Sequence, residues 1–138
     1  MKYKLASSTW DHNEIEAIEK VIASDNYSMG KFVELYERDF ADFFDAKFCV
    51  MTSSGSTANL LMIASMFFLS DDSKRLKRGD EVIVPAVSWS TTYFPLQQYG
   101  LKVKFVDIDL QTLNFNLSAL EEAISEKTKV IFAVNLLG

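Results

Sequence analysis

The segment TSSGST, residues 52–57, holds the residue types best suited to binding an anion. Glycine allows the backbone to approach a ligand closely, and free N–H groups at the start of a helix attract negative charge. This loop, residues 52–57, can therefore form a cup for a phosphate group. Serine is also a common helix cap, so Ser54 or Ser56 can instead serve only to begin the helix. Residue types alone leave these two interpretations equally supported.

A tryptophan offers a second kind of chemistry. Trp89 follows an apolar run that ends at Pro85, within the segment PAVSWSTT. An aromatic ring just beyond the end of a strand can stack on a planar cofactor. Such a residue is more often ordinary core or interface, and the sequence leaves both roles open. Asp107 and Asp109 have the spacing of metal ligands, but no histidine is near them, so turn formation and helix capping are the better interpretation.

These residues need secondary-structure elements that place them together. Apolar residues spaced three and four apart predict helices, and short apolar runs predict strands. The predicted helices cover residues 11–23, 31–44, 57–69, 88–99 and 118–124, and the predicted strands cover residues 48–51, 81–84, 102–106 and 129–134. Two pairs, Asp11 with Glu14 and Ser118 with Glu121, have the spacing of a capping box. Gly100 is expected to end the fourth helix.

Strands that alternate with helices predict βαβ units and a parallel sheet, preceded here by two helices. The strands are apolar nearly throughout, which is typical of a sheet covered on both faces. Ligands of such sheets bind beyond the carboxyl edge, where the loops that begin near residues 52, 85 and 107 are expected to meet. We therefore expect an α/β fold with its site at that edge.

Composition excludes several other classes of protein. The 138 residues carry 14 basic and 19 acidic side chains, a net charge of −5, which argues against broad nucleic-acid binding. One cysteine, Cys49, cannot form an intrachain disulfide. No apolar run is long enough for a membrane span, and residues 1–10 lack the apolar stretch of a signal peptide. A cytoplasmic protein is expected, with no metal site.

Taken together, these segments resemble a known family, the DegT/DnrJ/EryC1/StrS sugar aminotransferases. The resemblance covers nearly all of the chain. It is carried by LASSTWD (5–11), YSMG (27–30), SSGSTANLLMIAS (53–65), GDEVIVPAVSWSTTYFPLQQYGLKVKFVDID (79–109) and VNLLG (134–138). Within the family the segments are most similar to the 3-dehydratases that act on GDP-4-keto-6-deoxymannose, on the route to the O-antigen sugar colitose.

The resemblance implies a fold, a cofactor and a set of site residues. The fold would be the three-layer large domain of type I pyridoxal-phosphate enzymes, with a mostly parallel sheet after two N-terminal helices. Pyridoxal or pyridoxamine 5′-phosphate would be held at Gly55, Ser56 and Thr57, with Trp89 stacked on its ring. The nucleotide-sugar would be contacted by a turn and across a homodimer interface, the turn being Asn26, Tyr27, Ser28 and Met29. Glutamate is the expected amino donor.

The resemblance also implies that much of the enzyme lies outside these residues. We expect residues 1–45 to form a helical segment and residues 46–138 the first part of the cofactor-binding domain. The lysine or histidine that moves the proton is expected beyond Gly138, so no catalytic residue is predicted here and the fragment alone is expected to be inactive. The first strand, 48–51, is expected to lack its normal neighbours. An aminotransferase of the same family, a non-catalytic binding module and an unrelated Rossmann-like domain are the alternatives, and the absence of a Gly-x-Gly fingerprint disfavours the last.

Overall fold

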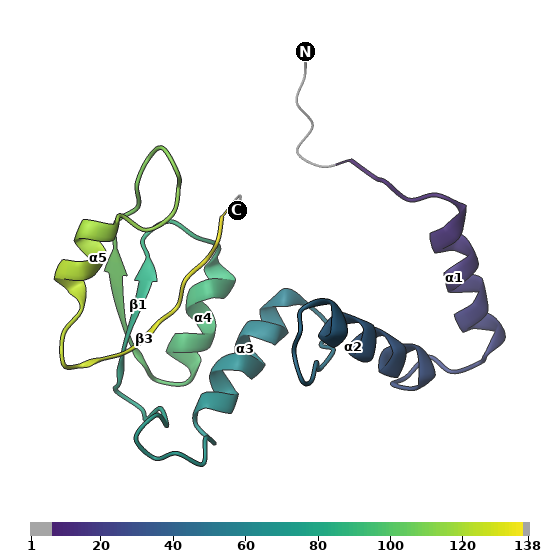
Figure 1. Ribbon diagram of the computed structural model, residues 1–138, viewed down its shortest axis with the longest axis horizontal. Coiled ribbons are helices and arrows are strands. Elements are labelled where there is room, and N and C mark those ends of the chain that lie inside the picture. Colours follow the sequence, from purple (N-terminus) through teal and green to yellow (C-terminus); the bar gives the residue numbers. More distant parts are fainter. Residues whose placement is uncertain (1–6, 137–138) are drawn as a thin grey trace. The chain divides into compact units, whose positions relative to one another are not determined.

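The computed structural model describes residues 7–136, which divide into two compact units, Met1–Met51 and Thr52–Gly138 (Figure 1). Each unit is described separately below. The expected boundary between residues 45 and 46 stays a prediction. Among the described residues, no helix combines the length and the apolar character that crossing a bilayer requires.

The second unit is built on a parallel three-stranded sheet. Its strands are β1 (Glu81–Pro85), β2 (Lys102–Val106) and β3 (Thr128–Ile131), in the spatial order β2-β1-β3. Val82 lies opposite Val103 on one side and Val130 on the other. The most apolar strand is thus the central one, where both edges are hydrogen-bonded and four successive side chains are buried. The predicted α/β class and the parallel sheet are confirmed.

Helices lie on both faces of this sheet. α4 (Ser90–Gln98) and α5 (Leu117–Ala123) lie on opposite sides of it in Figure 1. α3 (Gly55–Met66) packs against α4. The main core gathers buried side chains from these helices, the central strand and two loops: Ile63, Leu76, Val82, Val84, Leu96 and Leu101. Because both faces of the sheet are covered, the sequence of β1 is apolar throughout rather than alternating between apolar and polar residues.

The ends of these helices follow local rules, with one correction. α4 ends where Gly100 adopts a φ of +73°, and the amides of Gly100 and Leu101 donate to Gln97 and Leu96 as in a Schellman motif. The predicted Ser118–Glu121 capping box is wrong. Asn116 caps α5 instead, its side chain accepting a hydrogen bond from the Ala119 amide at 3.0 Å. The apolar pattern placed the helix start one residue late and so missed the stronger cap.

The first unit consists of two amphipathic helices, α1 (His12–Ala23) and α2 (Lys31–Phe43). The capping box predicted at Asp11 and Glu14 is present at the start of α1. The unit has almost no core of its own: Ala41 is the one buried apolar residue among those described. The apolar side chains of both helices are instead exposed, as in Ile15, Ile18, Ile22, Phe32, Tyr36, Phe40 and Phe43.

The strand predicted over residues 48–51 does not form. No ladder includes this segment within the described part of the chain, and Phe48 and Val50 are 78% and 64% exposed. A strand is defined by a hydrogen-bonded neighbour, and an apolar run without one cannot satisfy its backbone as a strand. The expectation that this segment lacks its normal neighbours is consistent with the structure. The one hydrogen bond recorded for its backbone joins the Met51 amide to Glu37 at 2.7 Å.

Candidate functional site

The loop before α3 is organised by one side chain. Ser54 is the N-cap residue, and its hydroxyl accepts a hydrogen bond from the Thr57 amide at 3.2 Å. The Thr57 hydroxyl accepts from the Ser54 amide at 3.0 Å and donates to the Ser54 carbonyl at 2.8 Å. The helix therefore begins at Gly55, two residues before the sequence-based start. Of the two interpretations of this segment, capping is correct for Ser54.

Capping by Ser54 leaves other donors free. The amides of Gly55 and Ser56 and the Ser56 hydroxyl have no acceptor among the described residues. A Cβ placed on Gly55 would meet no atom within 4 Å, so the surface at this first helical residue is uncrowded. Two free amides, a hydroxyl and the helix dipole are the donors that a phosphate needs. The residues present therefore fit a phosphate group, with Thr57 shaping the loop rather than offering its hydroxyl.

Trp89 is not a core residue. Its side chain is 76% exposed, which rules out the ordinary-core interpretation. It borders a cavity of about 390 Å³ whose lining comes from the segments that follow all three strands: Pro85, Val87, Ser88, Trp89, Thr92, Leu113, Val134 and Leu136. The cavity therefore lies at the carboxyl edge of the sheet, as parallel topology predicts. Its largely apolar lining and exposed indole suit a flat aromatic ligand.

A cluster of hydroxyl groups lies beneath the Trp89 loop. The hydroxyls of Ser88 and Thr92 are 2.8 Å apart, and the Tyr93 hydroxyl donates to the Pro85 carbonyl at 2.8 Å. Burial raises the pKa of the Tyr93 phenol, and the nearby Ser88 hydroxyl offsets part of that rise. These contacts join the end of β1 to the first turn of α4. No role was predicted from the sequence for Ser88, Thr92 or Tyr93. The available signal was that Ser88 and Thr92 lie four residues apart, one on each side of Trp89.

The phosphate-binding candidates and Trp89 belong to the same unit, and one side chain links their helices. The Asn59 amide nitrogen in α3 donates to the Thr91 carbonyl in α4 at 3.2 Å. Both residues lie in the first two turns of their helices, so the N-termini of α3 and α4 are held at the same end of the unit. The free amides of Gly55 and Ser56 and the indole of Trp89 therefore lie at the same end of this unit.

Asp107 and Asp109 act in a turn. The Asp109 carboxylate accepts backbone hydrogen bonds from Gln111 at 2.8 Å and Thr112 at 3.0 Å. Those bonds, led by the one from Thr112, lower the pKa of Asp109 below its usual value. Asp107 accepts from the amide of Ile108 at 2.8 Å. No group of three potential metal ligands occurs within residues 7–136. The hydrogen bonds of Asp107 and Asp109 place both carboxylates in the turn, as the turn interpretation expects.

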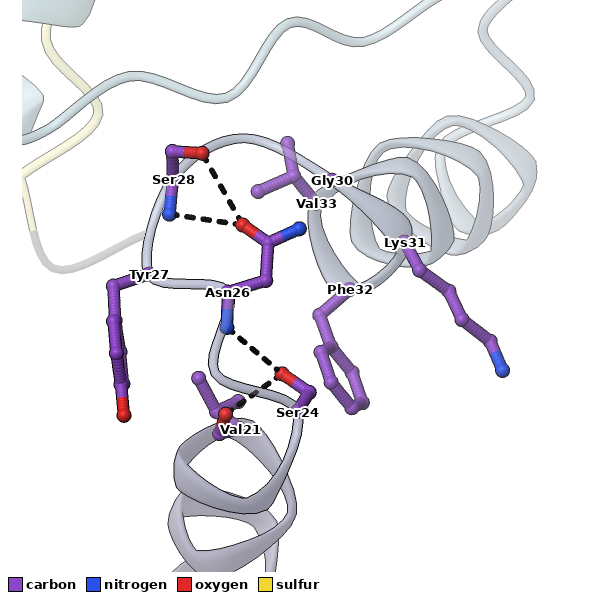
Figure 2. Close-up of a pocket in the computed structure, with 9 residues that line it drawn as sticks. All are labelled: Val21, Ser24, Asn26, Tyr27, Ser28, Gly30, Lys31, Phe32 and Val33. Carbon is purple, nitrogen blue, oxygen red and sulfur yellow. Dashed lines mark hydrogen bonds between the residues drawn. The ribbon is translucent and has the colours of Figure 1, made fainter.

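The turn predicted to contact a sugar lies in the first unit, between α1 and α2 (Figure 2). Asn26 organises it: its side-chain oxygen accepts from the amide and the hydroxyl of Ser28, both at 3.2 Å. The Asn26 side chain points toward Gly30, where an added Cβ would lie 2.8 Å from its amide nitrogen, so a larger residue there would require the Asn26 side chain to move. Tyr27 and Met29 are each 69% exposed.

A cavity of about 430 Å³ adjoins this turn. Its polar lining includes Ser24, Asn26, Tyr27, Ser28 and Lys31, and its apolar lining includes Val21, Phe32 and Val33. Tyr27 lies on the opposite side of the turn from Phe32 in Figure 2. Hydroxyl, amide and ammonium groups around an open pocket are suited to a polar ligand that carries negative charge.

Comparison with known proteins decides the family. The sequence pattern of the DegT/DnrJ/EryC1/StrS aminotransferase family matches residues 8–138. The chain belongs to this family. The match extends across both units, so the helical unit as well as the sheet unit is part of the pattern that defines DegT/DnrJ/EryC1/StrS proteins.

Two relatives within this family are similar over the whole chain. GDP-4-keto-6-deoxy-D-mannose 3-dehydratase of Yersinia pseudotuberculosis is 63% identical over 138 residues, and the enzyme of that name from Escherichia coli O55:H7 is 60% identical. Each comparison covers 100% of this chain and 35% of the relative. The chain therefore spans about a third of the length of these relatives.

Solved structures agree with the sequence comparison. The E. coli GDP-4-keto-6-deoxy-D-mannose 3-dehydratase with bound hydrated PLP matches with a TM-score of 0.89 at 60% identity, over 94% of this chain and 33% of that one. A putative sugar aminotransferase from Streptococcus pneumoniae, in its PMP form, matches with a TM-score of 0.80 at 25% identity, over 94% and 31%. The chain thus has the α/β fold of the DegT/DnrJ/EryC1/StrS pyridoxal-phosphate enzymes.

Proposed function

We propose that this chain is the first part of a pyridoxamine-phosphate-dependent 3-dehydratase that acts on a GDP-linked 4-keto-6-deoxyhexose. The observation that carries the proposal is the pairing, in one unit, of free amides at the start of α3 with an exposed tryptophan at the start of α4. Identity of 60–63% to two GDP-4-keto-6-deoxymannose 3-dehydratases supports this substrate over those of other family members.

The phosphate of the cofactor would bind at the start of α3. The amides of Gly55 and Ser56 have no acceptor among the described residues, and the Ser56 hydroxyl adds a third free donor. Thr57 supports the same site indirectly, because its hydroxyl and amide are bonded to Ser54 and hold the first turn in place. A phosphate there would also interact favourably with the positive end of the helix dipole.

The ring of the cofactor would lie in the cavity beside Trp89. The indole presents an exposed face, and the opposite lining of Leu113, Val134 and Leu136 is apolar. The Asn114 side chain steadies that lining, since its oxygen accepts from the Leu136 amide at 3.1 Å and its nitrogen donates to the Leu136 carbonyl at 3.4 Å. The cavity would thereby exclude water from one side of the ring.

The turn at Asn26–Met29 would contact the nucleotide-sugar. Its exposed Tyr27 can stack or donate a hydrogen bond, and the neighbouring Lys31 can pair with a diphosphate. A homodimer in which this turn meets the partner subunit's cofactor is part of the proposal, with glutamate as amino donor. The single cysteine supports a reducing compartment such as the cytoplasm.

The bound cofactor supplies an electron sink that makes loss of the C3 hydroxyl possible. This chain's own residues bind and orient: Gly55 and Ser56 would anchor the phosphate, Trp89 would fix the ring plane, and the cavity lining would keep water away. The group that moves the proton would come from outside these 138 residues. The chain alone is therefore expected to bind the cofactor without turnover.

The test uses the full-length protein that carries this chain. It is mixed with pyridoxamine phosphate, glutamate and GDP-4-keto-6-deoxymannose, and the nucleotide-sugar is analysed by mass spectrometry. Loss of the C3 oxygen is expected. An amino group introduced at C4 with C3 intact would contradict the dehydratase proposal and favour an aminotransferase. Absence of any cofactor absorbance in the purified, cofactor-treated protein would favour a non-catalytic binding module.

A further inference from the structure

Thr92 is the only polar side chain that is buried within residues 7–136; it is 5% exposed. Its hydroxyl lies 2.8 Å from that of Ser88, so the buried oxygen has a partner. Both residues line the cavity beside Trp89. Thr92 is buried and Ser88 is half-buried, so removing the Ser88 hydroxyl is costly because the buried Thr92 oxygen must then find another partner.

The pair brackets Trp89 along the chain. Ser88 precedes the tryptophan, Thr92 follows it by three residues, and the Thr92 amide donates to the Trp89 carbonyl at 2.9 Å. The backbone on both sides of Trp89 is therefore tied to one buried point. On the strand side, the Tyr93 hydroxyl holds the Pro85 carbonyl at 2.8 Å, which fixes where this loop leaves β1.

The residue type at the helix start is itself informative. Trp89 is the N-cap residue of α4 and makes no side-chain capping hydrogen bond. Serine, threonine, aspartate and asparagine are strongly preferred at this position, and α1, α3 and α5 use aspartate, serine and asparagine there. A tryptophan at a cap position loses that stabilisation. The bond between Ser88 and Thr92 satisfies no backbone amide, but it ties the residue before the cap position to the first turn of α4.

We propose that the Ser88–Thr92 hydroxyl pair positions Trp89, holding its indole in one orientation as a wall of the cavity. The identity of the ligand that contacts this wall rests on the proposed function. The orientation itself is a property of the protein without any ligand. Ser88 and Thr92 are thus positioning residues that act through Trp89, not residues that hold the ligand directly.

The experiment compares Ser88→Ala and Thr92→Val with Ser90→Ala, in the full-length protein. Ser90 is the matched control, because it flanks Trp89 on the other side, is exposed and has no hydrogen-bond partner among the described residues. The protein is labelled with 5-fluorotryptophan, and the ¹⁹F resonance of Trp89 is assigned by its loss in Trp89→Phe. The unliganded wild type and Ser90→Ala are expected to show one narrow Trp89 line. In the two test variants that line is expected to broaden or to split, because the indole is no longer held in one orientation.

A second measurement asks whether the effect passes through Trp89. Affinity for pyridoxamine phosphate is expected to fall about three- to tenfold in Ser88→Ala and Thr92→Val, the range that loss of one hydrogen bond gives. In a Trp89→Ala background the same substitutions are expected to change the affinity by less than about twofold, because coupled residues are not additive. Ser90→Ala is expected to have no effect in either background.

The outcomes separate this proposal from the proposed function. A Trp89 resonance that is unchanged in both test variants would overturn the positioning role, as would an affinity loss that persists in full without Trp89. If wild-type protein binds no pyridoxamine phosphate, the proposed function is contradicted, and the fluorine spectra of the unliganded protein still decide the positioning role. If one test variant fails to fold, the other carries the same measurement.

Discussion

The two units of the chain differ in how far they bury their apolar side chains. In residues 52–136 a central strand, β1, is covered by helices, and Ile63, Ile83 and Leu96 are fully buried. In residues 7–51 the helices are as amphipathic as any in the chain, yet their apolar faces are exposed. The aromatic residues of α2 and its C-cap touch mainly one another, with ring centroids 4.7 Å apart for Phe40 and Phe44.

The difference teaches what an amphipathic pattern does and does not specify. The pattern fixes which face of a helix is apolar, but the partner that covers this face has to come from elsewhere. In the sheet unit the partner is β1, which is close in sequence. In the helical unit, residues 7–51 supply none among themselves, and exposed apolar patches of this kind mark interaction surfaces. The proposed homodimer and the remainder of a longer chain are both suitable partners for it.

The largest expected effect on stability comes from replacing one isoleucine by alanine in each unit. In the 138-residue chain, Ile63→Ala should lower the free energy of unfolding by about 2–5 kcal/mol, because it opens a cavity in the core. Ile18→Ala, at a helix position that is 45% exposed, should cost less than about 0.5 kcal/mol. Urea titration followed by circular dichroism measures both values.

Repeating this pair in the full-length protein sharpens the comparison. If the helical unit gains a partner there, Ile18→Ala should become costly, by about 1 kcal/mol or more, while Ile63→Ala keeps its cost. An Ile18→Ala cost in the 138-residue chain as large as that of Ile63→Ala would break the comparison. It would mean that α1 is covered within this chain after all.

A smaller effect separates two hydroxyl residues in the sheet unit. Thr57→Val removes a hydroxyl that bonds both the amide and the carbonyl of Ser54, so it should destabilise the protein by about 1–2 kcal/mol. Ser56→Ala removes a hydroxyl without a described partner and should leave stability within about 0.5 kcal/mol. Ser56→Ala should instead weaken pyridoxamine phosphate binding about three- to tenfold. Thermal unfolding and equilibrium titration distinguish the two, and equal stability losses would contradict this division of roles.

Much of the sheet unit was predictable because its signals are local. The apolar run of β1, the glycine that ends α4 and the order of strands and helices each follow from a few neighbouring residues. The prediction of a strand over residues 48–51 was wrong because a strand depends on a partner that is distant in sequence. The composition of this segment suits a strand, but strands need a hydrogen-bonded neighbour, and composition carries no information about whether a neighbour is present.

The candidate site was predictable only in part. The sequence indicated an anion cup at Gly55–Thr57, but it did not separate the residue that builds the loop, Thr57, from the free donors of Gly55 and Ser56. The hydroxyl pair of Ser88 and Thr92 was missed, since its significance depends on burial, which a single sequence does not show. The sugar-contacting role of Asn26–Met29 rested on family resemblance alone and stays a prediction.

Helix caps give a test of intermediate size that again contrasts the two units. Asp11→Ala removes the capping box of α1, a helix without buried residues, and should raise the amide exchange rates of its first turns by about three- to tenfold, or about 1 kcal/mol. In the sheet unit, Asn116→Ala should lower global stability by about 1 kcal/mol. Ser118→Ala is the control and should change neither. Hydrogen exchange resolved by residue measures the first effect, and uniform changes across both units would contradict it.

The smallest effect concerns one carboxylate in the loop between β2 and α5. Backbone bonds from Thr112 and Gln111 hold the pKa of Asp109 below its unfolded value of 3.8. Because the folded pKa is the lower one, this carboxylate stabilises the loop above the unfolded value, and the stabilisation is lost as pH falls through the folded pKa. Asp109→Asn keeps an acceptor oxygen without the charge, so its stability should depend less on pH below pH 4. Carboxyl NMR titration gives the direction of the shift, with Glu122→Gln as the control for removing a carboxylate that accepts no described hydrogen bond; an Asp109 pKa above 3.8 would show that the turn does not hold the charged form.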